Sequence, residues 1–297
     1  MVGGICIVIV VFMTRALPCP AGGAAPFRDI PFEWRPPNGP KAAYEMADPL
    51  DQHHILLHPG VKKGGRYPVV VGFHGQPKRG KNPRDYMFRQ GILETLAPLV
   101  ETNSVAPFVL VLPVFRFLGQ NWPGFDPKPF RDAVETELKK QDIETGDWYA
   151  FGHSGAAGCG GDGLNLAHRL SPKRVAFIDV CLGEGWQREI QVLKKKGIST
   201  LHIHSVETAG FRPKQRPEYQ SNFDFGRAFA PLGLKPVPCE GPHPGEKLRN
   251  QPFRCAATDD GLVRGFIVDT GEGVAAHEAA LKVGFRFFLM TALGAPR

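Results

Sequence analysis

A glycine-rich pentapeptide near the middle of the chain places a serine where it could act as a nucleophile. Residues 152–156 read Gly-His-Ser-Gly-Ala and directly follow the short apolar run Trp148–Phe151. A sharp strand-to-helix turn lifts a serine hydroxyl above a sheet edge, and it is so crowded that small residues are needed two positions before and after the serine. Gly152 and Ala156 occupy those positions. The pattern therefore predicts that Ser154 is a nucleophile.

A second motif supplies hydrogen-bond donors for an oxyanion. The apolar run Pro68–Phe73 is typical of a buried strand, and it leads into His-Gly-Gln at 74–76. Together with the serine motif, this strand resembles the α/β-hydrolase family, in which backbone N–H groups after such a strand and after the nucleophile stabilise the oxygen that becomes negative when an acyl group is attacked. The candidate donors are Gly155 and Gln76, with Gly75 as the alternative to Gln76.

A serine nucleophile also needs a base that accepts its proton, and an imidazole commonly does this. The resemblance implies a histidine just before the last helix, and His277 stands between the last predicted strand and the final predicted helix, so it is the favoured base. His243, in a Gly-Pro-His-Pro-Gly loop, is the alternative.

The resemblance also implies a carboxylate that orients the imidazole, placed after a strand that follows the serine. Glu207 follows the predicted strand Thr200–Val206 and is the favoured acid. Asp179, at the end of the predicted strand Arg174–Val180, is the alternative.

In order and spacing, these motifs resemble the α/β-hydrolase family of serine hydrolases, secreted esterases and lipases among them, over most of residues 55–293. The resemblance implies a Ser-His-acid triad that cleaves carboxylic esters of small or polymeric acyl substrates through an acyl-serine intermediate, without a cofactor. The same groups would serve a peptidase, an amidase or an acyltransferase, and an inactive relative would only bind a ligand or partner.

The elements that must position these residues alternate along the chain. The predicted strands are Ile55–His58, Pro68–Phe73, Phe108–Leu112, Trp148–Phe151, Arg174–Val180, Thr200–Val206 and Gly265–Val268. The predicted helices are Arg84–Val100, Phe130–Lys140, Leu164–Leu170, Trp186–Lys196, Phe223–Leu232 and Glu278–Leu293. This alternation predicts an α/β fold, a three-layer sandwich in which helices flank both faces of a mostly parallel central sheet. The carboxyl ends of its strands share one edge, where such sheets bind ligands.

The two ends of the chain are expected to differ in role. Gly4–Met13 is an apolar run of signal-peptide length, too short to span a bilayer comfortably. Residues 1–26 are therefore predicted to be a signal peptide or leader, which implies secretion or periplasmic export and no stable membrane span after its removal. Residues 27–297 are predicted to form one domain with loop insertions near 209–222 and 239–262.

The cysteines fit an oxidising compartment. Four of the six lie beyond the leader, and of their three possible pairings we favour Cys159–Cys181 and Cys239–Cys255, because each pair is close in sequence. The cysteines lack the CxxC spacing of a structural zinc site.

Other binding functions have weaker signals. The net charge is +7, yet the sequence lacks zinc-finger spacing, an RNA-binding aromatic motif and a long Lys/Arg block, so we predict no nucleic-acid partner. His202 and His204 alternate along one strand, which would suit a metal but is more typical of core histidines. Gly158–Gly163 matches a dinucleotide-binding pattern only formally, since it starts well after the strand end.

Substrate preference has one candidate determinant. The aromatic residues Phe115, Phe117, Trp122 and Phe125 follow the strand Phe108–Leu112. They are expected either to line an acyl or aromatic pocket or to pack on one another as a rim.

Overall fold

The structure is a computed structural model, and it describes ten parts of the chain. These are residues 27–44, 52–75, 91–115, 122–156, 162–180, 186–205, 233–238, 254–268, 270 and 273–294. The predicted leader, the insertion near 209–222 and the predicted helix Phe223–Leu232 lie outside them.

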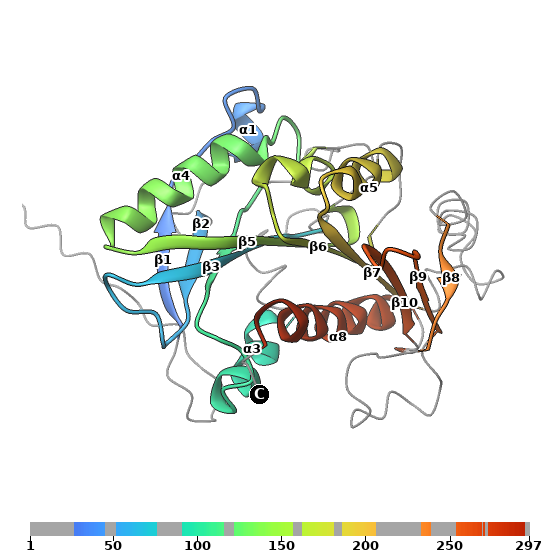
Figure 1. Ribbon diagram of the computed structural model, residues 1–297. Coiled ribbons are helices and arrows are strands. Elements are labelled where there is room, and N and C mark those ends of the chain that lie inside the picture. The colour runs from blue at the N-terminus through green and yellow to red at the C-terminus, as the bar shows by residue number, and fades with distance from the viewer. Residues whose placement is uncertain are drawn as a thin grey trace, which may run out of the picture.

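A single sheet of ten strands runs through the described part of the molecule (Figure 1). Its strands are β1 (Arg28–Phe32), β2 (His53–Leu57), β3 (Arg66–Phe73), β4 (Val109–Leu112), β5 (Glu144–His153), β6 (Arg174–Ile178), β7 (Ser199–Ser205), β8 (Lys235–Pro236), β9 (Arg254–Ala257) and β10 (Val263–Val268). They are ordered β1-β2-β4-β3-β5-β6-β7-β10-β9-β8 across the sheet. All pairs from β4 to β10 are parallel, and the pairs at both margins are antiparallel.

Helices cover both faces of this sheet (Figure 1). On one face lie α1 (Lys41–Tyr44), α4 (Pro127–Lys140), the 3₁₀ helix η3 (Gly163–Leu170) and α5 (Trp186–Lys195). On the other lie α3 (Ile92–Glu101) and α8 (Gly273–Leu293). The predicted fold class, a mostly parallel sheet between two helical layers, is confirmed. None of the described helices is long and apolar enough to cross a membrane.

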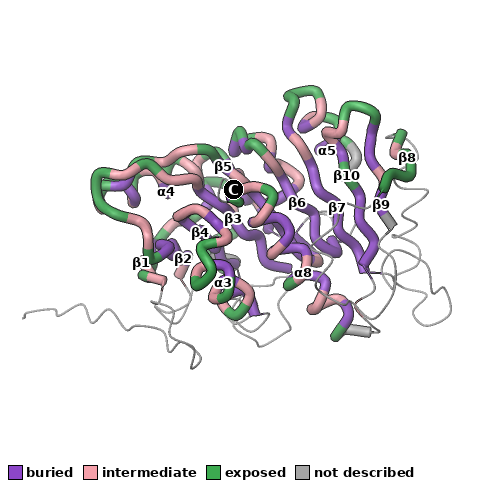
Figure 2. Tube along the Cα trace, turned by 60° about the horizontal axis from the view of Figure 1, so that its bottom comes forward, coloured by how far each residue is buried: buried purple, intermediate pink, exposed green. Residues whose placement is uncertain are grey.

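Two hydrophobic clusters hold the layers together. Side chains alternate between the faces of a strand, so Val69 and Val71 of β3 join the cluster under α4, whereas Val70 joins the cluster under α8. The central strands are consequently buried along most of their length (Figure 2). This explains why their sequences are continuous apolar runs.

Strands β5 and β9 differ from the predicted elements. Strand β5 begins at Glu144, before the apolar run Trp148–Phe151, because pairing with β3 extends it into polar residues. Strand β9 lies within 239–262, a stretch that the sequence pattern assigns to an insertion, and it pairs with β10. Cys255 of β9 is disulfide-bonded. The other cysteines of the two favoured pairings, Cys159, Cys181 and Cys239, lie outside the described residues, so both pairings stay predictions.

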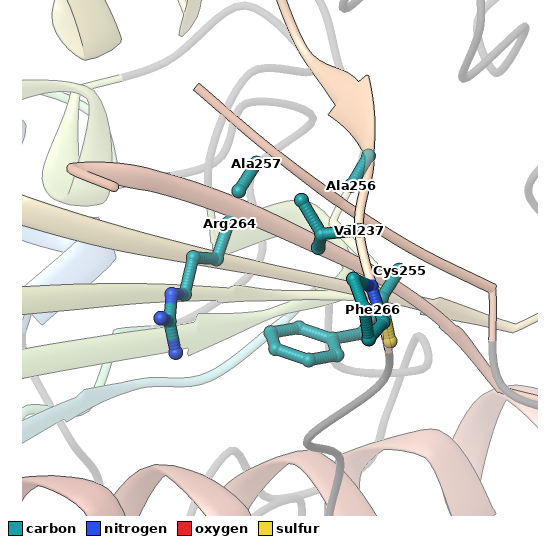
Figure 3. A pocket seen from close by; sticks show the side chains of 7 residues that line it. Val237, Cys255, Ala256, Ala257, Arg264 and Phe266 are labelled. Atoms are coloured by element: carbon teal, nitrogen blue, oxygen red, sulfur yellow. The ribbon is translucent and has the colours of Figure 1, made fainter. Parts of the chain in front are cut away.

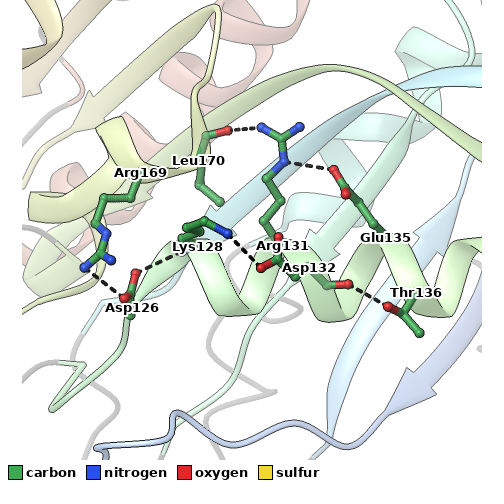
Figure 4. Close-up of polar contacts among 8 residues, drawn as sticks. All are labelled: Asp126, Lys128, Arg131, Asp132, Glu135, Thr136, Arg169 and Leu170. Carbon is green, nitrogen blue, oxygen red and sulfur yellow. Dashed lines mark hydrogen bonds and ion pairs between the residues drawn. The ribbon is translucent and has the colours of Figure 1, made fainter.

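Polar contacts tie the segment after the serine turn to α4 (Figure 4). Arg169 pairs with Asp126 at 2.8 Å, and Arg131 donates a hydrogen bond to the carbonyl of Leu170. The expected helix in this segment is a 3₁₀ helix with a kink at Leu166. The carboxyl-terminal end of this helix is therefore anchored by tertiary contacts with α4 and its N-cap residue.

Candidate active site

The candidate nucleophile lies on a strained turn at the carboxyl end of β5. Ser154 has a φ of 57° and is partly exposed to solvent. Left-handed backbone at a residue other than glycine is uncommon and costs energy, so the surrounding packing must impose it. A Cβ at Gly152 would lie 2.7 Å from Ala156 Cβ and from Leu164 Cδ2. This crowding is the physical reason for the small residues around the serine.

The carboxylate that contacts the predicted base is Asp179. His277, near the start of α8, has its Nδ1 2.6 Å from Asp179 Oδ2. The Asp179 side chain is fully buried, whereas the His277 side chain is 26% exposed. Asp179 directly follows β6, which pairs with β5, so the acid and Ser154 follow the ends of neighbouring strands.

Asp179 is held in turn by the end of β7. The Ser205 N–H donates to Asp179 Oδ1 at 2.9 Å, and the Ser205 hydroxyl donates to Oδ2 at 3.0 Å. The Asp179 N–H donates to the Ile203 carbonyl at 2.6 Å. These bonds offset the cost of burying the carboxylate, and they fix its direction despite a left-handed φ of 47° at Asp179.

His204 lies beside the same carboxylate but is uncharged near neutral pH. Its Nδ1 is 3.8 Å from Asp179 Oδ1, and its side chain is fully buried. Burial lowers the pKa of His204 to about 4, an effect that the Asp179 charge opposes only in part. The two residues therefore do not form an ion pair at pH 7, despite their distance.

His202, the other residue of the metal interpretation, stacks on Phe177 with ring centroids 4.8 Å apart. Within the described parts of the chain, no group of three or more His, Cys, Asp or Glu side chains could hold a metal ion.

His153 joins the serine turn to His277. Its Nε2 lies 3.0 Å from the His277 carbonyl oxygen, and the two rings pack with centroids 4.2 Å apart at 30°. Because His153 directly precedes Ser154 in the chain, this contact brings the start of α8 against the turn.

The predicted oxyanion strand ends in a tightly bonded loop. His74 Nε2 accepts the Phe115 N–H at 3.1 Å, so the ring proton is on Nδ1, which donates to the Gly75 carbonyl at 2.6 Å. Burial lowers the pKa of His74 to about 3, which keeps this ring neutral. The Trp122 indole donates to the His74 carbonyl at 3.0 Å. The backbone at Gly75 is thus held from several sides.

The aromatic residues after β4 form interior packing. Phe115, Trp122 and Phe125 are fully buried. The Trp122 ring contacts Phe115 and Phe125, and both Trp122 and Phe125 contact Phe73. In the described structure they fill the core beneath the His74 loop, which favours the self-packed alternative over an open pocket. Phe117 lies outside the described residues.

Of the predicted site residues, Ser154, Gly155, Gly75, His277 and Asp179 lie in described segments. Gln76, Glu207 and His243 do not. Ser205 and His153 were not predicted as site residues. Ser205 bonds Asp179, and His153 directly precedes Ser154 in the chain. A single serine or histidine at the end of a strand is nevertheless too common in sequences to indicate a site.

A small cavity of about 180 Å³ lies elsewhere, at the margin formed by β8, β9 and β10 (Figure 3). It is lined by Val237, Pro238, Cys255, Ala256, Ala257, Arg264 and Phe266. None of these residues contributes to the serine turn or its histidine and acid, so the cavity is separate from the candidate active site.

The described sheet is mostly parallel, and a serine on a left-handed turn follows β5. The ring of His277, near the start of the last helix, packs on the ring of His153, the residue before that serine. The fold is that of an α/β-hydrolase. No protein-family model and no curated protein matches the chain.

Solved structures with a similar fold include esterases. A ferulic acid esterase is 14% identical over 80% of this chain and 92% of its own, with a TM-score of 0.49. The feruloyl esterase module from Clostridium thermocellum, complexed with sinapinate, is 10% identical over 97% and 95%, with a TM-score of 0.49. The siderophore hydrolase EstA from Aspergillus nidulans is 13% identical over 81% and 89%, with a TM-score of 0.43. At these identities and TM-scores, the likeness carries no activity over to this chain.

Proposed function

We propose that this protein is a serine hydrolase that cleaves carboxylic esters through an acyl-serine intermediate, with Ser154 as nucleophile, His277 as base and Asp179 as acid. The observation that carries the proposal is the 2.6 Å contact between His277 Nδ1 and the buried Asp179 carboxylate. The His277 ring also packs on His153, which directly precedes Ser154 on its strained strand-end turn.

The geometry of Asp179 defines the protonation of His277. A carboxylate can only accept, so the proton lies on Nδ1 and leaves Nε2 as the nitrogen that accepts a proton. Nε2 takes the Ser154 proton as the hydroxyl oxygen attacks the ester carbonyl, and it then passes that proton to the leaving alcohol. In the second step Nε2 takes a proton from water as the water oxygen attacks the acyl-serine carbonyl, and it then returns that proton to the Ser154 oxygen as the carboxylic acid product leaves. Asp179 stabilises the imidazolium that forms in both steps.

The sequence favours Glu207 as the acid of the triad, and in this proposal Asp179 takes that role instead. Its support is direct contact with His277 together with burial and the Ser205 bonds. The proposed oxyanion donors are the Gly155 N–H and the N–H of Gln76 or Gly75, next to the loop that His74 holds. Each such donor contributes on the order of 3 kcal/mol to lowering the barrier.

A fluorophosphonate probe and a panel of acyl esters of varied chain length test the nucleophile. We expect the wild-type protein to be labelled and to hydrolyse at least one ester, and Ser154→Ala to do neither. Ser104→Ala, at a serine outside the site, is the matched control and should behave as wild type. Labelling that persists in Ser154→Ala, or a folded wild-type protein that is neither labelled nor active, would refute the proposal.

The acid is tested by removing one charge at a time. Asp179→Asn should lower kcat by about 10⁴-fold, because an amide orients the wrong imidazole tautomer toward the serine. Asp259→Asn, at an exposed carboxylate, should leave kcat unchanged. Near-wild-type activity of Asp179→Asn together with inactive Glu207→Gln would transfer the role of acid to Glu207.

A further inference from the structure

His153 lies between the serine turn and the helix that carries the proposed base. Its side chain is fully buried at the end of β5. Its Nε2 is 3.0 Å from the His277 carbonyl oxygen, and its ring packs against the His277 ring. One side chain therefore contacts both the backbone and the imidazole of His277.

The direction of the hydrogen bond defines the state of His153. A carbonyl oxygen only accepts, so His153 Nε2 carries a proton and donates it. Burial, and then the proximity of His277, lower the pKa of His153 well below its usual value, while Asp179 and the bond to the His277 carbonyl raise it to a smaller extent. The ring is thus a neutral donor near pH 7.

We propose that His153 is a positioning residue for the proposed hydrolysis, a neutral imidazole that fixes the backbone and ring of His277 relative to Ser154. The inference rests on the proposed function for its catalytic meaning. Asp179 holds the His277 ring at Nδ1 from β6, and His153 holds the His277 carbonyl from β5. The base is thereby connected to both strand ends that carry its partners.

The neutrality of His153 matters when His277 becomes charged. With ring centroids 4.2 Å apart, a second cation would oppose formation of the imidazolium that the mechanism requires. A neutral ring gives the same packing and the same hydrogen bond without that repulsion. His153 exchanges no proton with the substrate in this role, so its loss should lower kcat and leave KM nearly unchanged.

Two substitutions separate packing from hydrogen bonding. His153→Phe keeps an aromatic ring but has no donor, and His153→Gln keeps an N–H at a similar reach. We expect kcat of His153→Phe to fall on the order of tenfold to a hundredfold, as for a displaced catalytic group, with KM within about twofold. His153→Gln should recover most of the loss. The matched control is His58→Phe, which replaces the buried histidine that directly follows β2 and should keep wild-type kcat.

A readout that does not need activity is the NMR signal of the proton between His277 and Asp179 in ¹⁵N-histidine-labelled protein. Asp179→Asn identifies the signal by removing it. We expect a sharp line in wild type and His153→Gln, and a line broadened by solvent exchange in His153→Phe. If His153→Phe does not fold, His153→Leu, which also lacks a donor, replaces it.

A line that is equally sharp in wild type and in the folded variant without a donor overturns the positioning role, whatever the kinetics show. The two proposals fail separately. A wild-type protein that hydrolyses no ester and takes no label refutes the proposed function, while the NMR comparison still decides whether His153 positions His277.

Discussion

Lowering the pH from 7 to 4 should destabilise this protein steeply, because several buried histidines are held neutral in the fold. The pKa of His53 is lowered to about 4, that of His74 to about 3 and that of His204 to about 4, in each case mainly by burial. His53 and His74 also accept backbone N–H groups, those of Val114 and Phe115. Protonation would remove the acceptor in both.

The sign and size of this pH effect on the free energy of unfolding follow from how many protons the folded and unfolded states bind. In the unfolded chain these histidines bind protons near pH 6.5, whereas in the folded chain they do so only near pH 3 to 4. Between those values the unfolded state binds more protons, so stability that is present above pH 6.5 is lost as the pH falls. At pH 5 each histidine contributes a slope of roughly 1.3 kcal/mol per pH unit, and the three together roughly 4. Since a domain is stable by only about 5–15 kcal/mol, acid unfolding is expected near pH 4 to 5.

Urea unfolding at pH 7, 6, 5 and 4 measures the slope, and histidine NMR titration assigns it. His53→Gln should reduce the slope at pH 5 by about a third, whatever it does to stability at pH 7. An unfolding free energy that is flat between pH 7 and 5 would refute the reasoning. So would resonances of His53 and His74 that titrate near pH 6.5 in the folded protein.

Two further predictions concern the candidate site. Ser205→Ala removes the hydrogen bond from the Ser205 hydroxyl to Asp179 Oδ2, so it should lower the free energy of unfolding by about 2 kcal/mol and kcat on the order of tenfold, and Ser205→Thr should restore both. Denaturant unfolding and ester kinetics measure the two effects, and an unchanged kcat would show that the backbone N–H bond alone holds Asp179. Gly152→Ala places a Cβ 2.7 Å from atoms of Ala156 and Leu164, so it should lower the free energy of unfolding by about 1–3 kcal/mol and abolish fluorophosphonate labelling of Ser154. A variant that is as stable as wild type and fully labelled would contradict the role of crowding at this turn.

Local sequence was sufficient for the features that neighbouring residues determine. The apolar run Pro68–Phe73 and the pattern around Ser154 predict a buried strand and a strand-end turn, and the structure contains both. These features were predictable because burial on both faces and crowding at a turn restrict the residues that can stand at those positions. Strand β9 was not predictable in this way, since its partner β10 is what makes it a strand.

The partner of His277 could not be read from the sequence. Asp179 stands at the end of one predicted strand and Glu207 follows the next, both in the expected chain order. Order along the chain does not say which carboxylate reaches the first turns of the final helix. The sheet order decides the contact, because β6 lies between β5 and β7 and places Asp179 where His277 and Ser205 both bind it. Likewise, Phe115 and Trp122 pack in the core because of elements distant in sequence.

The sequence by itself therefore determined the layers of the fold and the strand-end position of Ser154, since both depend on periodicity and local crowding. The tertiary structure alone decided which carboxylate contacts His277 and that His153 contacts it from β5. Those contacts join residues roughly a hundred positions apart, and their distances depend on how strands and helices pack together.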